Sequence, residues 1–259
     1  VYEIPEGSKN SKGRAIQNLI NIEQDDKVKA FICTQDLKDE DYVNSHYVIM
    51  ATKMGQVKKT SLEQYSRPRS NGINAITIKD DDELLEAKLT NGNSQIMLAV
   101  KSGKAIRFEE NKTRPMGRNA SGVRGIRLKD NNDEVVGMIS VNDMDANILV
   151  VSENGFGKRS SLEDYRLTNR GGKGVKTISI TEKTGKLVTL KSVSDNDDLM
   201  IINKSGIAIR MQVEDLRVMG RATQGVKVIS IKEGDSIAAV AKVMNCLLYT
   251  SPSPRDGRI

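Results

Sequence analysis

The chain has 259 residues, and 40 Lys and Arg against 34 Asp and Glu give it a formal net charge of +6 at pH 7. No apolar run approaches the ~20 residues that a membrane-spanning helix needs, so no membrane partner is expected. Two cysteines, Cys33 and Cys246, cannot build a disulfide framework, which favours a reducing cytoplasm. The chain shows no signal peptide and does not begin with Met, so we expect its natural start to be missing.

The first 35 residues are predicted to be the second half of a repeat unit. Residues 11–16 contain a glycine followed by a basic strand pattern, and residues 27–32 form a short apolar run typical of a strand. An acidic connecting loop is expected at 36–42.

Four segments of similar length follow, at about 46–93, 94–143, 146–195 and 197–243. Each begins with an apolar strand that ends at a turn glycine, and these glycines lie 48, 52 and 51 residues apart: Gly55, Gly103, Gly155 and Gly206. A basic strand comes next, then a second glycine that opens a third strand, at Gly72, Gly122, Gly174 and Gly225. A closing apolar strand ends each segment, at 84–89, 134–141, 187–193 and 237–243.

Four short strands in each unit of about 50 residues are typical of a propeller blade. The sequence therefore predicts an all-β fold, a β-propeller or β-pinwheel of repeated four-stranded blades, with four complete blades and one partial blade. A β-sandwich with coincidental spacing is the alternative. Because only 3% of residues are aromatic and Trp is absent, WD-type blades are disfavoured. Residues 244–259 show neither the repeat nor a strand pattern, so we expect a non-native or disordered tail.

The sequence gives little support for a catalytic function. His46 is the only histidine and has no recognisable nucleophile motif near it, so a structural role is expected. No Cys/His cluster has metal-ligand spacing, and no phosphate-binding loop is present. The acidic stretches 80–83 and 195–198 fall between strands, where solvated turn residues are expected. We therefore expect no catalytic residue, no metal and no cofactor in this chain.

Basic residues instead recur at equivalent positions, which in a propeller lie on the same circular surface. A surface of this kind binds a phosphate backbone electrostatically and without sequence preference. The scarcity of aromatic stacking platforms favours duplex DNA over single strands. The alternative is that these cations only keep the rim soluble. The candidate DNA-binding residues are Lys58, Lys59, Arg107, Lys158, Arg159 and Arg210 on the second strand, Arg67, Arg69, Arg114, Arg118, Arg170, Lys173, Arg217 and Arg221 in the loop before the second glycine, and Arg124, Arg127, Lys176 and Lys227 after it.

Residues 114–128, 154–159 and 218–226 resemble blades of a known family, the C-terminal domain of the DNA gyrase A protein, and the resemblance extends in order over 1–243. It implies a six-bladed, spiral β-pinwheel that wraps duplex DNA around its basic perimeter. It also implies a parent that is an ATP-dependent type II topoisomerase, an isomerase that introduces negative supercoils with ATP hydrolysed by its partner protein. The implied partners are a second copy of gyrase A and the gyrase B subunit, in a heterotetramer of the bacterial cytoplasm at the nucleoid.

The resemblance is incomplete at two places. The breakage-reunion domain with its catalytic tyrosine is absent, so no tyrosine here inherits that role. The blade that carries the family's gyrase A box is absent too, and residues 168–174 only resemble that box, with Thr168 and Asn169 where the box has glutamine and a basic residue. We therefore hypothesise that the loop 169–174 is a secondary DNA anchor. The alternatives are the related domain of topoisomerase IV, which supports decatenation, and a propeller that acts as a protein-interaction scaffold.

Overall fold

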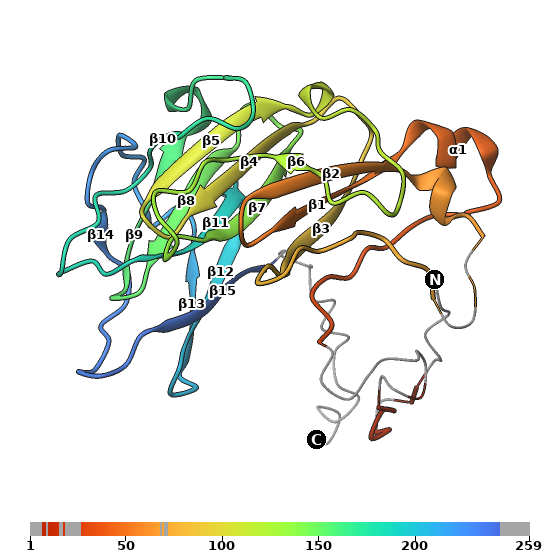
Figure 1. The fold of residues 1–259 in the computed structure, drawn as a ribbon. Coiled ribbons are helices and arrows are strands. Elements are labelled where there is room, and N and C mark those ends of the chain that lie inside the picture. The colour runs from red at the N-terminus through yellow and green to blue at the C-terminus, as the bar shows by residue number, and fades with distance from the viewer. Residues whose placement is uncertain are drawn as a thin grey trace, which may run out of the picture.

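The structure, a computed structural model, describes residues 7–8, 10–15, 18, 27–67, 69 and 72–243. The prediction of an all-β fold is confirmed, because antiparallel sheets make up most of this part of the chain. In Figure 1 the sheets follow one another from the orange β1–β3, through the yellow and green strands, to the blue β12, β13 and β15. The predicted tail, 244–259, lies outside the described residues.

The strands recur in the predicted order within each segment. The opening strands are β1 (Tyr47–Thr52), β4 (Gln95–Val100), β8 (Asn147–Ser152) and β12 (Asp198–Asn203). The basic strands are β2 (Gln56–Ser61), β5 (Lys104–Glu109), β9 (Phe156–Ser161) and β13 (Ala208–Gln212). The closing strands are β3 (Leu84–Thr90), β7 (Val135–Val141), β11 (Leu187–Val193) and β15 (Ile237–Val243). The strands that follow the second glycine have only two residues each: β6 (Val123–Arg124), β10 (Val175–Lys176) and β14 (Val226–Lys227).

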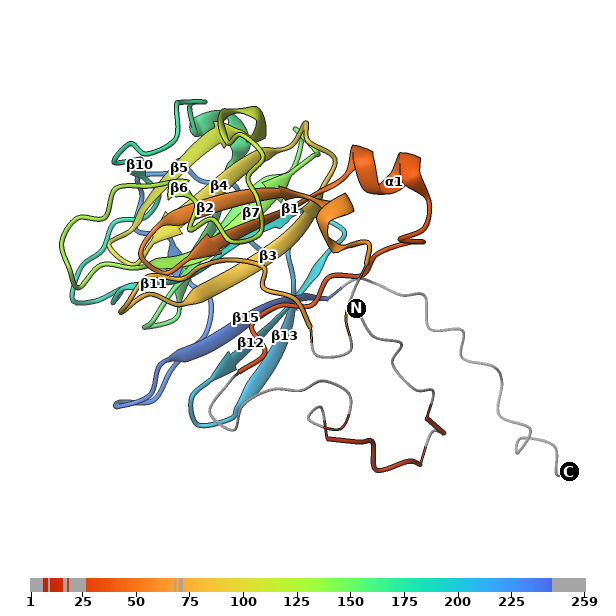
Figure 2. The same ribbon diagram turned by 45° about the vertical axis from the view of Figure 1, so that its right-hand side comes forward.

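Three short 3₁₀ turns follow the basic strands: η2 (Leu62–Tyr65), η3 (Glu110–Lys112) and η4 (Leu162–Asp164). The α-helix α1 (Glu40–Ser45) occupies part of the stretch predicted to be an acidic loop. Its N-terminus is capped by the side chain of Asp39, which accepts hydrogen bonds from the backbone N–H groups of Asp41 and Tyr42. α1 lies beside η2 at one end of the sheet of β1 and β2 (Figure 2).

Each four-stranded sheet combines strands from two segments. The strand orders are β3-β1-β2-β6, β10-β5-β4-β7 and β11-β8-β9-β14, so the two-residue strand always joins the sheet of the preceding segment. The expectation that one segment forms one complete blade is corrected accordingly. Among the described residues there are three four-stranded sheets and one of three strands, β13-β12-β15.

Two other predicted strands are absent from the described residues, and a third is absent from its described part. Residues 72–78 are not a strand, because their partner would be the basic strand of a preceding sheet, and the described residues before 46 form none. Residues 27–32, predicted as a closing strand, are likewise irregular. Residues 11–15 contain no strand, and Ile16, at the end of the predicted strand 11–16, lies outside the described residues.

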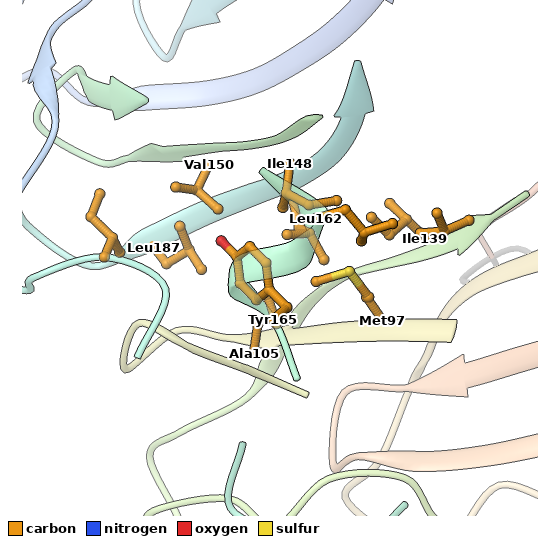
Figure 3. Close-up of a cluster of buried hydrophobic side chains, with 12 residues drawn as sticks. Met97, Ala105, Ile139, Ile148, Val150, Leu162, Tyr165 and Leu187 are labelled. Carbon is orange, nitrogen blue, oxygen red and sulfur yellow. The ribbon is translucent and has the colours of Figure 1, made fainter. Parts of the chain in front are cut away.

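The hydrophobic core is divided into layers between successive sheets. Figure 3 shows one layer, in which Leu162 and Tyr165 from the turn after β9 lie among Met97, Ile139 and Ile148 of neighbouring strands. The Tyr165 hydroxyl is 2.5 Å from the Thr177 hydroxyl, which pairs it inside this layer. Stacking on both faces explains why the strands do not alternate cleanly between apolar and polar residues.

The two edges of each sheet have different surroundings. The closing strands β3, β7, β11 and β15 contact one another from sheet to sheet, so they form the inner edge. The strands β6, β10 and β14 lie at the opposite edge of their sheets. This opposite edge, the outer edge, carries the second glycines and many of the predicted DNA-binding residues.

Candidate nucleic-acid interface

The second-strand lysines are buried. Lys58 and Lys158 are 0% and 1% exposed. The Lys58 ammonium donates to the carbonyl of Ala75 at 2.5 Å and to the carbonyl of Arg118. The Lys158 ammonium donates to the carbonyl of Gly220 at 2.6 Å. Both lysines therefore hold the loop that the next segment lays across their strand.

The next position of the basic strands, four residues after the turn glycine, carries cations that are also hydrogen-bonded or paired, Lys59 on β2 and Arg107 on β5. Lys59 forms an ion pair of 2.9 Å with the buried Glu110. Arg107 donates to the carbonyls of Leu162 and Tyr165 at 2.8 and 3.0 Å. Cations of the second strand thus fasten the turn that follows the basic strand of the next segment.

Arg159 and Arg210 complete the set. Arg159 donates to the carbonyl of Leu216 and pairs with Asp195, and the Arg210 Nε donates to Asp198 at 2.6 Å. The expectation that the second-strand cations lie on an open surface is corrected for Lys58, Lys59, Lys158 and Arg159, which are all buried. These four therefore have no place in the proposed DNA surface.

Burial also changes the acidity of these groups. Loss of hydration, together with the nearby Arg118 guanidinium, lowers the pKa of Lys58 to about 8. Burial lowers the pKa of Lys158 to about 8 as well, opposed by Asp164 and assisted by Arg221. Burial also lowers the pKa of Arg107 from its ordinary value.

The accessible cations form three rows along the outer edge, defined by their distance from the second glycine. We call these the outer rows. One lies eight residues before the glycine, one lies four residues before it, and one lies two residues after it. Their members are Arg114, Arg166 and Arg217; Arg118, Arg170 and Arg221; and Arg124, Lys176 and Lys227.

Exposure differs between the rows. The first and third rows are exposed, and the middle row is partly buried. Arg166 is not among the candidates predicted from the sequence. Aligning the loops on the second glycine places Arg166 at the position equivalent to Arg114 and Arg217. Arg67, Arg69, Arg127 and Lys173 are exposed outside the rows.

The outer rows lie on backbone that is linked from one sheet to the next. Arg170 donates to the carbonyl of Arg124 at 3.1 Å, and Arg221 donates to the carbonyl of Lys176 at 2.8 Å. The backbone N–H of Ser179 also bonds to the carbonyl of Thr223 at 3.1 Å. A middle-row arginine therefore contacts the backbone of a third-row residue in the preceding sheet, which makes one continuous basic edge.

The second glycines allow this close approach. Gly174 has φ +70°, and a Cβ there would lie 2.5 Å from the carbonyl oxygen of Ala105. Of the pair in the box-like loop, Gly171 has φ +81° whereas Gly172 does not adopt a positive φ. The Gly171 N–H donates to the carbonyl of Gly125 at 2.6 Å, so this N–H is not free to bind a phosphate.

The remaining candidates have local structural roles. The Nδ1 of His46 is 2.8 Å from the carbonyl of Tyr42, at the end of α1. Asp82 accepts from the N–H groups of Met54 and Glu83, and it thereby closes a turn. Within the described ranges, no group of three or more His, Cys, Asp or Glu side chains is placed to hold a metal ion. No helix in this part of the chain combines the length and apolar character needed to cross a membrane.

Solved structures with the same fold come from two related kinds of domain. A C-terminal domain of DNA topoisomerase IV matches with a TM-score of 0.82 and 25% identity over 90% of this chain and 71% of that one. A DNA gyrase A C-terminal domain matches with a TM-score of 0.78 and 24% identity over 90% of this chain and 76% of that one.

Sequence comparison is more specific. The DNA gyrase A proteins of Staphylococcus epidermidis and Staphylococcus aureus are 43% identical over 243 and 244 residues, or 93% of this chain. The chain spans only 27% of the length of these relatives. The family described as the DNA gyrase C-terminal domain, a β-propeller, matches residues 1–35, 46–91, 95–142, 146–194 and 197–244. The chain therefore belongs to the DNA gyrase C-terminal domain family.

Proposed function

We propose that this chain binds duplex DNA without sequence preference and wraps it along the outer rows. The observation that carries the proposal is the recurrence of accessible cations at equivalent positions on one continuous edge. Arginine and lysine side chains along such an edge can neutralise the phosphates of a duplex. Contacts to phosphates position a duplex but do not read its sequence.

The wider role is proposed from the family. Because the chain spans about a quarter of the gyrase A proteins that it matches, the supercoiling activity belongs to a larger assembly. We propose that wrapping supports ATP-dependent negative supercoiling together with the gyrase B subunits and a second copy of gyrase A. The chain itself then supplies no catalytic group, and its place is with the nucleoid in the bacterial cytoplasm.

The topoisomerase IV alternative is favoured by one observation, the higher TM-score with that domain. The gyrase A relatives at 43% identity favour the first proposal. Joined to the remaining parts of its parent, a gyrase domain would support the introduction of negative supercoils, whereas a topoisomerase IV domain would support decatenation.

The test is the salt dependence of binding to random-sequence duplexes, measured by fluorescence anisotropy. Each phosphate contact contributes about 0.9 to the slope of log K against log[salt], so Lys176→Ala with Lys227→Ala should reduce the magnitude of the slope by about 1.8. Both lysines are exposed and lie at the outer edge.

The matched control is Lys38→Ala with Lys204→Ala, which removes two exposed lysines outside the outer rows. We expect this control to leave the slope nearly unchanged. Equal effects of the two pairs, or no salt dependence at all, would contradict the proposed surface. The second outcome would support the protein-scaffold alternative.

A further inference from the structure

The Lys58 and Lys158 ammonium groups lie directly beneath loops of the DNA-facing edge. Lys58 donates to the carbonyl of Arg118, a member of the middle outer row. Lys158 donates to the carbonyl of Gly220, and the next residue is Arg221, the middle-row arginine of that loop. Each buried ammonium therefore fixes the backbone beside one outer guanidinium.

The fold does not need a lysine at this position. Counted from the turn glycine, Ile106 and Ile209 occupy the equivalent positions in their own segments. Ile106 is 2% exposed and packs in a hydrophobic layer. Burying an ammonium in place of such a side chain is unfavourable unless the group is well paired. Each lysine is paired with loop carbonyls, so its burial depends on that contact.

We propose that Lys58 and Lys158 are positioning residues for DNA binding, which hold the loops of Arg118 and Arg221 and take up protons when DNA binds those arginines. The inference rests on the proposed function. It adds that binding at the outer edge is coupled to groups with no access to the DNA.

The charged and titratable groups around each lysine set the direction of the coupling. Lys58 faces the Arg118 guanidinium, and the Tyr65 hydroxyl donates to the same Ala75 carbonyl at 3.4 Å. The pKa of Tyr65 is raised by burial, so this phenol stays neutral.

The surroundings of Lys158 are similar but include one acid. Lys158 faces Arg221 and Asp164, and the neighbouring Tyr165 also has a pKa raised by burial. A phosphate bound at Arg118 or Arg221 offsets the repulsion between guanidinium and ammonium. It therefore raises the pKa of the lysine beneath.

The expected size follows from linkage. Both lysines have a pKa of about 8 in the free protein. A rise of about half a unit at each on binding makes DNA affinity about sevenfold weaker at pH 9 than at pH 6.5. The same shifts give an uptake of about half a proton per chain near pH 8.

The experiment measures DNA affinity of the whole chain from pH 6.5 to 9 at fixed ionic strength, with a random-sequence duplex. The comparison is Lys58→Arg with Lys158→Arg, which keeps a permanent charge in place of each titrating group. Calorimetry at pH 8 in buffers of different ionisation enthalpy counts the protons taken up. We expect the change of about sevenfold and the uptake in the unsubstituted chain, and a flatter profile with little uptake in the arginine variant.

A second measurement needs no variant, in case the larger arginine side chain prevents folding. The ¹³Cε signals of Lys58 and Lys158, titrated with and without DNA, should move to higher pKa in the complex. Unchanged pKa values would overturn the inference while leaving DNA binding intact. A chain that binds no DNA at any pH would overturn the proposed function and this inference with it.

Discussion

Two loops at the outer edge occupy equivalent places and are held in different ways. Loop 217–224 is anchored from below by the Lys158 ammonium, which donates to Gly220. Loop 166–173 lies over Ile106 instead, and its anchors are its own backbone groups. The Gly171 N–H donates to the carbonyl of Gly125, and the carbonyl of Gly172 accepts from the N–H of Arg127 at 2.8 Å.

The comparison shows that equivalent loops can be held either by a buried ammonium group or by backbone hydrogen bonds at glycines. The charged anchor tolerates ordinary backbone angles, since Gly220 does not adopt a positive φ. The glycine anchor brings backbones into contact and requires φ +81° at Gly171. We therefore expect the two loops to fail under different substitutions.

The largest expected effect on stability comes from placing a lysine beneath the loop that glycine backbone holds. Ile106→Lys places an ammonium at a position that is 2% exposed and packed in a hydrophobic layer, so the charge loses its hydration. We expect the free energy of unfolding to fall by about 3 kcal/mol. Denaturant unfolding followed by circular dichroism measures this change.

The reverse exchange is the control. After Lys158→Ile, the carbonyl of Gly220 still accepts from the N–H and hydroxyl of Thr223 at 3.2 and 2.9 Å. The buried Ser160 hydroxyl loses the hydrogen bond that it accepts from Lys158 at 3.3 Å but keeps its interaction with Tyr165, so the free energy of unfolding should change by less than about 1 kcal/mol. Equal losses in the two variants would show that the two anchors are interchangeable.

An intermediate effect is expected from the glycine anchor. Gly171→Val forces a β-branched residue into the left-handed region, where its Cβ lies 3.4 Å from the carbonyl oxygen of Arg124. We expect a loss of about 2 kcal/mol, which corresponds to a fall in Tm of roughly 4–8 °C. Gly220→Val is the control, because nothing lies within 4 Å of its Cβ. A similar fall in Tm for both variants would mean that the backbone angle of Gly171 is not what limits its loop.

The sequence predicts the repeating strands well because their signals are local. Turn glycines and apolar runs determine where each long strand begins and ends. The exchange of short outer strands between segments is not local, since β6 pairs with β2 across more than sixty residues of chain. Nothing in the spacing alone distinguishes pairing within a segment from pairing with the preceding one.

The absence of a local signal also explains why the sequence predicts four second-strand cations to be exposed although they are buried in the structure. Adjacent residues of a strand point to opposite faces, but both faces are covered here, so Lys58 and Lys59 are both buried. One signal was available: the position of Lys58 and Lys158 is isoleucine in the other segments, at Ile106 and Ile209. An alternation of lysine and isoleucine indicates a covered position more than an open rim.

The smallest expected effect is on DNA binding, and it depends on the charge of each loop rather than on how the loop is held. The glycine-anchored loop carries Arg170 and Lys173, whereas the equivalent positions of the lysine-anchored loop are Arg221 and the uncharged Gln224. If both loops contact DNA, Arg170→Ala with Lys173→Ala should lower the magnitude of the salt slope by about 1.8 and weaken binding at physiological salt.

The matched pair, Arg221→Ala with Gln224→Ala, removes one charge and should lower the slope by only about 0.9. The first pair also removes two side-chain hydrogen bonds, from Arg170 to the carbonyls of Lys112 and Arg124, and the second pair removes one, from Arg221 to the carbonyl of Lys176. Because all three bonds are solvent-exposed, the free energy of unfolding should fall by less than about 1 kcal/mol in either variant. The ratio of the two slope changes is therefore the decisive quantity, and anisotropy titrations at salt concentrations from about 50 to about 200 mM measure it. A slope that is unchanged by the first pair would make loop 166–173 a connector, and its likeness to the box would then have no part in binding.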